Sequence, residues 1–133
     1  MANIEKFEDI QAWQKARELA HVIYKLCEKT SLKKDYRLKD QILGSSGSVM
    51  DNIAEGFDRG GNKEFVHFLT ISKASAGEVK SQLYRALDRK HIDRSTFETI
   101  YAQADEICKM LAGLIVYLNK SDLKGIKYKD RRN

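Results

Sequence analysis

The chain has 133 residues, carries 24 Lys and Arg against 19 Asp and Glu, and contains no Pro and two Cys. This length is enough for one domain that buries about two thirds of its unfolded surface. No segment approaches the roughly 20 apolar residues of a membrane-spanning helix, and the first residues do not read as a signal peptide, so we expect a cytoplasmic protein without a membrane partner. Cys27 and Cys108 are too few for a disulfide framework or a four-ligand zinc site, and their apolar surroundings predict buried, reduced thiols.

The first half of the chain predicts two helices. Apolar residues recur three and four positions apart over residues 9–29 and again over residues 36–58, which is the spacing of one buried helix face. Residues 30–35 connect the two segments, and Gly60-Gly61 ends the second where left-handed backbone dihedrals cost little. The expected buried positions are Ile10, Trp13, Ala16, Leu19, Ala20, Ile23, Leu26 and Cys27 in the first helix, and Leu38, Ile42, Val49, Met50, Ile53 and Phe57 in the second.

The second half predicts two more helices. Asn62 is a favourable N-cap residue for a helix that runs to about residue 90. The segment Ser95-Thr96-Phe97-Glu98 reads as a capping box that begins the last helix, whose apolar stripe reaches Leu118. The expected buried positions are Phe65, Phe68, Leu69, Ala76, Val79, Leu83 and Leu87 in the third helix, and Phe97, Ile100, Tyr101, Ala104, Ile107, Cys108, Leu111, Leu114, Ile115 and Leu118 in the fourth.

Four helices joined by short connections must return on themselves, so the sequence predicts an all-α fold, an antiparallel up-down-up-down four-helix bundle, over residues 1–119. This bundle is nearly neutral, with 18 Lys and Arg against 17 Asp and Glu. Residues 120–133 carry a net charge of +4 and few apolar residues, and we expect them to form a flexible C-terminal tail. The tail is either a solubilising terminus or an arm that contacts nucleic-acid phosphates through Lys120, Lys124, Lys127, Lys129, Arg131 and Arg132.

Two Glu-x-x-His motifs have the spacing used by dinuclear metal sites in helix bundles. They are Glu18 with His21 and Glu64 with His67, on different predicted helices. At about 100° per residue, however, Glu18 lies opposite the apolar stripe of its helix, and His67 lies about 150° from the centre of the stripe on its own helix. Ligands of an interior ion must project inward, so we expect no metal site.

Nothing else in the sequence predicts catalysis. Both thiols lie on apolar stripes, where desolvation raises the pKa of a thiol and disfavours the reactive thiolate. The segment Gly44-Ser45-Ser46-Gly47 lies within a predicted helix and follows no strand, unlike a phosphate-binding loop. We therefore expect a protein that is not an enzyme and has no cofactor.

The second and third predicted helices each carry a stripe of polar residues at alternating spacings of three and four. An ordinary solvated face is normally richer in Lys and Glu than these stripes are. A stripe of small polar residues lets another helix approach closely and offers it hydrogen bonds, so it predicts an intersubunit surface, with a plain exposed face as the alternative. This polar seam consists of Gln41, Ser45, Ser48, Asn52, Glu55 and Arg59 in the second helix, and Ser75, Glu78, Gln82, Arg85 and Arg89 in the third.

The same part of the chain resembles a known family. The segment Asn52-Ile53-Ala54-Glu55-Gly56-Phe57, followed by Ile71-Ser72-Lys73-Ala74-Ser75, is similar to the four-helix bundle proteins encoded in 23S rRNA intervening sequences. The opening Trp13-Gln14-Lys15-Ala16 fits as well, and the resemblance covers residues 7–118. One departure is Leu43-Gly44-Ser45, where the family usually has one or two Arg followed by Ala.

The resemblance implies a homopentamer of four-helix bundles with no established enzymatic activity. Accessory proteins of diversity-generating retroelements are similar, and they form basic pentamers that engage nucleic acid and a reverse transcriptase. We therefore interpret the chain as an oligomeric, non-enzymatic accessory protein that associates with RNA or DNA. The alternative is an assembly or scaffold module that recognises another protein and binds no nucleic acid.

Overall fold

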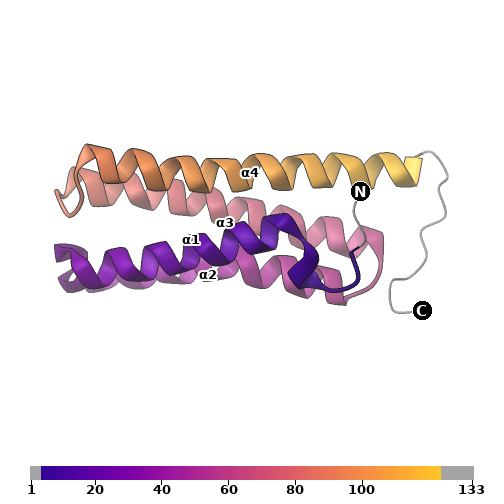
Figure 1. The fold of residues 1–133 in the computed structure, drawn as a ribbon, viewed down its shortest axis with the longest axis horizontal. Coiled ribbons are helices and arrows are strands. Elements are labelled where there is room, and N and C mark those ends of the chain that lie inside the picture. Colours follow the sequence, from indigo (N-terminus) through magenta and orange to yellow (C-terminus); the bar gives the residue numbers. More distant parts are fainter. Residues whose placement is uncertain (1–3, 124–133) are drawn as a thin grey trace.

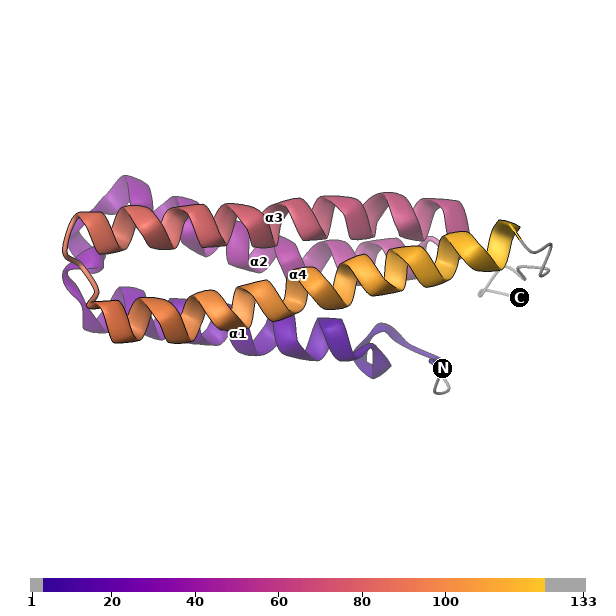
Figure 2. The ribbon, with the colours of Figure 1, turned by 90° about the horizontal axis from the view of Figure 1, so that it is seen from above.

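The structure is a four-helix bundle (Figures 1 and 2). The computed structural model describes residues 4–123, and all regular secondary structure in this range is helical. Successive long helices run in opposite directions and each packs against the next, which confirms the predicted all-α, up-down-up-down architecture. No helix in the described range is long and apolar enough to span a membrane. In chain order the elements are the 3₁₀-helix η1 (Phe7–Asp9), α1 (Gln11–Lys29), the 3₁₀-helix η2 (Ser31–Lys34), α2 (Tyr36–Asp58), α3 (Asn62–Asp88) and α4 (Arg94–Leu123).

The four predicted apolar stripes meet in one core along the axis of the bundle. Leu19, Ile42, Leu69 and Leu111, one from each long helix, are fully buried. Burying a side chain of this size stabilises the fold by roughly 1.5–3 kcal/mol. Predicted core residues at the edges of the stripes are only half-buried: Ala20, Met50, Phe68, Leu87, Tyr101, Cys108, Leu114 and Ile115.

The first turn of α4 is capped by Asp93, and the predicted capping box at Ser95 is wrong. Oδ1 of Asp93 accepts a hydrogen bond of 2.8 Å from the backbone N–H of Thr96. The backbone N–H of Phe97 donates to the carbonyl of Asp93, which is the first bond of the helix. Asp and Ser are about equally good N-cap residues, and the charge of the carboxylate also complements the helix dipole. The bonds to Thr96 also hold the pKa of Asp93 below its usual value.

Asn62 does not act as the predicted N-cap of α3. Gly61 holds that position, and Asn62 is the first helical residue, with a buried side chain. Nδ2 of Asn62 donates a hydrogen bond of 2.9 Å to the carbonyl of Leu118 in α4. The amide therefore ties the start of α3 to the last turns of α4, which continues to Leu123.

Helices α2 and α3 share the most extensive contact in the bundle, and they come very close at Gly56. A methyl group on Gly56 would lie 2.6 Å from Cβ of Phe68 and 3.2 Å from Cδ1 of Phe65. The first distance is far inside van der Waals contact, and Cβ of Phe68 is fixed by the backbone of α3. The ring of Phe57 packs edge-on against Phe65 beside this point, with centroids 5.8 Å apart. Only a hydrogen atom at position 56 fits this spacing of the helices.

We predict that Gly56→Ala destabilises the fold by about 1–3 kcal/mol, because the added methyl group forces α2 and α3 apart. Gly44→Ala is a matched control in the same helix, since its methyl group would meet no atom within 4 Å. This control should gain about 0.5–1 kcal/mol from the higher helix propensity of Ala. Urea unfolding followed by circular dichroism measures both changes, and a stabilised Gly56→Ala chain would contradict the close approach.

Candidate functional site

The two halves of the polar seam face each other within the protomer. Because α2 and α3 are antiparallel neighbours, the start of α2 lies beside the end of α3 (Figure 1). Near the middle, the hydroxyls of Ser48 and Ser75 share a hydrogen bond of 3.0 Å. Ser72, which is fully buried, donates a bond of 2.6 Å to the carbonyl of Val49. Much of the seam therefore joins two helices of one chain, which its periodicity did not indicate.

Asn52 and Glu55 make their hydrogen bonds along α2 itself. Nδ2 of Asn52 donates to the carbonyl and to the hydroxyl of Ser48, both at 2.8 Å. Glu55 forms an exposed ion pair of 2.9 Å with Arg59, one turn later. Arg59 also lies 3.7 Å from Glu64 of α3, so this end of the seam connects the two helices by charge.

The arginines of α3 connect the other end of the seam. Nη1 of Arg85 donates a hydrogen bond of 2.8 Å to the side-chain oxygen of Gln41. Nη1 of Arg89 donates one of 2.8 Å to Oδ2 of Asp35, the residue before α2. The seam thus has small hydroxyl side chains where Ser48 meets Ser75, the carboxylate of Glu78 one turn further along α3, and charged groups at both ends.

A polar hollow of about 340 Å³ opens from the seam to solvent. Gln82 in its wall is nine-tenths buried, and its side-chain oxygen has no hydrogen-bond donor in the described part of the chain. An unpaired buried polar atom costs about 1–3 kcal/mol. The oxygen itself is enclosed within the protomer, so the amide of Gln82 must turn toward the hollow to meet a donor from outside. Its walls are Gln41, Ser45, Glu78, Ser81, Gln82 and Arg85.

A second polar cluster joins the two connections at one end of the bundle. The hydroxyl of Ser31 in η2 lies 2.7 Å from Nδ1 of His91, in the turn between α3 and α4. Nε2 of His91 lies 2.9 Å from Oδ2 of Asp35, which also accepts the bond from Arg89. Hydrogen bonds from His91 and Arg89 lower the pKa of Asp35 from 3.8 to about 2. We call Ser31, Asp35, Arg89 and His91 the loop clamp.

Ser31, His91 and Asp35 are also the residue types of a serine hydrolase triad. A nucleophilic serine acts in a water-excluded site, with hydrogen-bond donors aimed at the developing oxyanion. Ser31 instead lies exposed on a short 3₁₀-helix, and Arg89 shares the carboxylate with the histidine. The arrangement fits a structural clamp between two connections better than a catalytic site.

We predict that the loop clamp makes the bundle sensitive to acid through Asp35. The folded pKa lies below the unfolded value, so the charged carboxylate stabilises the fold above about pH 4, and this contribution is lost as the pH falls toward about 2. Near neutral pH, Asp35→Asn should unfold at a lower urea concentration than the parent chain, and the difference should shrink in acid. Asp40→Asn, at an exposed position in α2, is the control. A difference that is constant with pH for Asp35→Asn would contradict the prediction.

The Glu-x-x-His motifs lie on the surface, as helical phase predicts. No group of three or more His, Cys, Asp or Glu that could hold a metal ion occurs among the described residues. Burial raises the pKa of Cys27 to about 11 and also raises the pKa of Cys108, which disfavours both thiolates at neutral pH. The exposed motif residues are Glu18, His21, Glu64 and His67.

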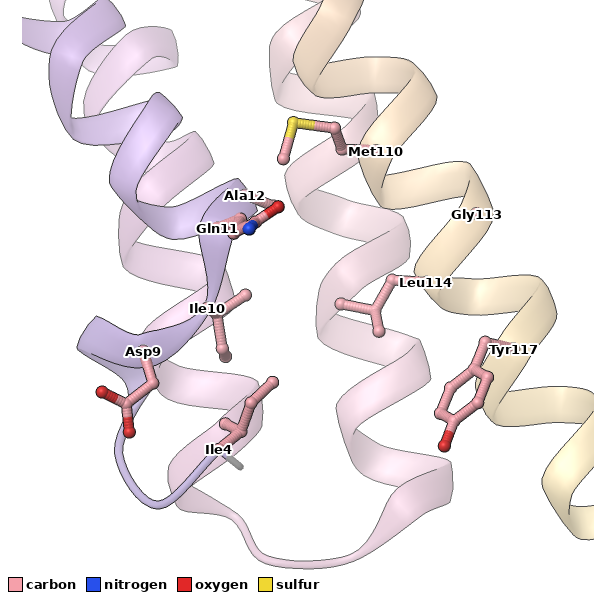
Figure 3. Close-up of a pocket in the computed structure, with 9 residues that line it drawn as sticks. All are labelled: Ile4, Asp9, Ile10, Gln11, Ala12, Met110, Gly113, Leu114 and Tyr117. Carbon is pink, nitrogen blue, oxygen red and sulfur yellow. The ribbon is translucent and has the colours of Figure 1, made fainter. Parts of the chain in front are cut away.

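An apolar hollow of about 450 Å³ lies between the N-terminal segment and α4 (Figure 3). Ile4 and Ile10 line one side, and Met110 and Leu114 line the other. Tyr117 stands at its rim with about half of its surface exposed. Of the neighbouring long helices, α1 and α4 share the least contact, which leaves this opening.

The predicted phosphate-contacting residues lie mainly outside the described range. Lys120 is an exposed residue of α4. The end of α4 lies at the opposite end of the bundle from the loop clamp and projects past the start of α3 (Figures 1 and 2). The remaining predicted residues are not among those described: Lys124, Lys127, Lys129, Arg131 and Arg132.

Comparisons with known proteins bear on the whole bundle. A family model described as 23S rRNA-intervening sequence protein matches residues 8–113. The crystal structure of a protein of unknown function from the S23 ribosomal protein family of Bacteroides thetaiotaomicron is similar, with a TM-score of 0.72 and 27% sequence identity, over 78% of this chain and 94% of that chain. No curated protein matches the sequence. The residues matched by the family model include both halves of the polar seam.

Proposed function

Because the chain belongs to the family of 23S rRNA-intervening sequence proteins, we propose that it is an oligomeric accessory protein of the cytoplasm that associates with RNA or DNA and catalyses no reaction. The similar Bacteroides protein is described as having unknown function. The proposal therefore depends on the charge and geometry of this chain.

The distribution of charge along the chain carries the nucleic-acid part of the proposal. Residues 4–123 hold 19 Lys and Arg against 18 Asp and Glu, a net charge of +1. Residues 124–133 hold five against one, a net charge of +4. A short segment with such an excess attracts phosphates over a distance and releases counterions when it contacts them. The described part of α4 ends at Leu123, at one end of the bundle (Figure 1), and this segment follows it in the sequence.

We predict that a chain ending at Leu123 binds mixed-sequence RNA and DNA more weakly than the full chain. Each phosphate contact contributes roughly 0.7 on single strands, or 0.9 on duplex DNA, to the slope of log affinity against log salt. Loss of five contacts should therefore lower that slope by about 3.5 on single strands. Fluorescence anisotropy at two salt concentrations measures it. A full-length chain with its last five Lys and Arg changed to Gln distinguishes the loss of charge from the loss of residues. Equal affinity of the full chain, the shortened chain and the substituted chain would contradict the prediction.

The polar hollow supports the oligomeric part of the proposal. The side chain of Gln82 lines the hollow beside Ser45 and Ser81, although its unpaired oxygen is itself buried. The small side chains of both serines leave room for the amide to turn outward toward a side chain from a second copy. A donor from that copy would satisfy the oxygen and bury the exposed flank of the polar seam. We propose the homopentamer that the family resemblance implies, with the hollow as part of the contact between subunits.

We predict that Gln82→Leu weakens assembly. In an isolated protomer this change removes an unpaired oxygen and leaves stability unchanged or higher, whereas at a subunit contact it deprives the partner's donor of its acceptor. That loss of about 1–3 kcal/mol weakens association roughly 5- to 150-fold per contact. Gln103→Leu is a matched control, because Gln103 also has an unpaired buried oxygen but lies on α4. Light scattering on a sizing column is the measurement. A parent chain with the 15.3 kDa mass of one protomer, or an unchanged mass for Gln82→Leu, would contradict the prediction.

The apolar hollow favours the alternative function, a scaffold module that recognises another protein. Its walls of Ile4, Ile10, Met110 and Leu114 suit the apolar face of a partner helix. Retention of the protein on a nucleic-acid column separates the two functions. Retention that falls with salt supports nucleic-acid binding, and the absence of retention at low salt favours the scaffold.

A further inference from the structure

The end of the bundle that carries the loop clamp is strongly basic. Residues 25–40 and 85–94 meet there, since the clamp joins their connections (Figure 1). Together they hold ten Lys and Arg against five Asp and Glu, a net charge of +5. The other described residues hold nine against 13, a net charge of −4. The near neutrality of the bundle therefore conceals a separation of charge along its axis. We call this end the basic pole.

Two of the five acidic groups of the basic pole are engaged by neighbours, the other three (Glu28, Asp40 and Asp88) are exposed, and many of the cations are unpaired within the described chain. Asp35 accepts hydrogen bonds from Arg89 and His91, and Asp93 caps α4. The cations next to the connections are exposed and form no ion pair with any described residue. They are free to meet anions from solution. These cations are Lys29, Lys33, Lys34, Arg37 and Lys90.

An exposed aromatic ring lies in the same stretch of sequence as four of these cations. Tyr36, the first residue of α2, is 69% exposed, which is the highest value among the exposed large hydrophobic residues of the described chain. It follows Lys34 by two positions, and Nζ of Lys39 lies 5.5 Å from the centroid of its ring. Aromatic rings set among cations are typical of surfaces that bind single-stranded nucleic acid, because unpaired bases stack on the rings while cations hold the phosphates.

We propose that the basic pole binds single-stranded RNA or DNA, with Lys33, Lys34 and Lys90 contacting phosphates and Tyr36 stacking on a base. The inference deepens the proposed function, on which it rests, by adding a contact at the opposite end of the bundle from the end of α4. Single strands are favoured over duplexes because the bases of a duplex are already stacked on each other. Stacking and phosphate contacts are tolerant of sequence, so no strong sequence preference is expected.

Lys90 allows charge to be removed from the pole without loss of stability. Its backbone is left-handed, with φ of 62°, at the end of α3. The backbone N–H groups of Lys90 and His91 close this helix end on the carbonyls of Leu87 and Ala86. Glycine adopts this conformation at less cost than any L-residue. Lys90→Gly therefore removes a cation and relieves backbone strain, so a loss of binding is not attributable to unfolding.

The test compares three variants of the full chain by fluorescence anisotropy at two salt concentrations. The pole variant removes three charges through Lys33→Gln, Lys34→Gln and Lys90→Gly. The matched control removes three charges at exposed positions elsewhere on the bundle, through Lys15→Gln, Lys63→Gln and Lys73→Gln. The third variant is Tyr36→Ala. The probes are a mixed-sequence single-stranded RNA and an abasic oligonucleotide, which offers phosphates without bases.

The pole variant should lower the salt slope of RNA binding by about 2, from three contacts of roughly 0.7 each, and the matched control should lower it less. Tyr36→Ala should weaken RNA binding about fivefold or more, and leave the abasic probe unaffected. Equal effects of the pole variant and the matched control overturn the proposal, as does an unchanged affinity for RNA in Tyr36→Ala. The full chain can still bind RNA strongly when the proposal is overturned in this way. If that binding is lost in a chain that ends at Leu123, the proposed function stands and only the contact at the basic pole is wrong. If the full chain binds no nucleic acid, both fail.

Discussion

The close approach of α2 and α3 is the constraint on which the rest of the bundle depends. A hydrogen atom at Gly56 and hydroxyl groups at Ser48, Ser72 and Ser75 bring the two helices near enough to bond through short side chains. Each such bond contributes only about 1 kcal/mol net. Together the bonds set the register of α2 against α3, and the short connection at residues 59–61 alone does not set it. α1 and α4 then complete the core from the flanks of this pair.

The antiparallel topology also explains how a nearly neutral bundle acquires a charged end. The connection between α1 and α2 and the connection between α3 and α4 lie side by side at one end of the bundle. Their positive charges therefore add up there, although the two segments are far apart in the sequence. α3 has 27 residues, and a helix of that length spans about 40 Å. The Debye length at physiological ionic strength is about 8 Å. The two ends of the molecule therefore attract or repel ions independently of each other. The net charge of the whole bundle does not indicate the electrostatic potential at either end.

Helical periodicity predicted the four long helices and their core, because each depends on residues three or four positions apart. The same periodicity found both halves of the polar seam but not that they meet, since it contains no information about which helices are neighbours; the short connection at residues 59–61 was the available signal. The bond between Ser31 and His91 crosses 60 positions, so no local pattern predicts the loop clamp. The cap of α4 was misassigned because Asp93 and Ser95 are both good caps, and only the position of the backbone N–H groups decides between them.

The sparse contact between α1 and α4 has a consequence for the dynamics of the bundle. Protection of backbone amides against hydrogen exchange is lowest where few apolar contacts hold an element in place. The N-terminal segment is the closest to that condition, because Ile4 and Ile10 pack against the core on one side and line the hollow on the other (Figure 3). Its amides should exchange through local opening, while α2 and α3 exchange only when the whole chain unfolds. Any molecule that fills this hollow would then register as slowed exchange in the first turn of α1, with little change in the core.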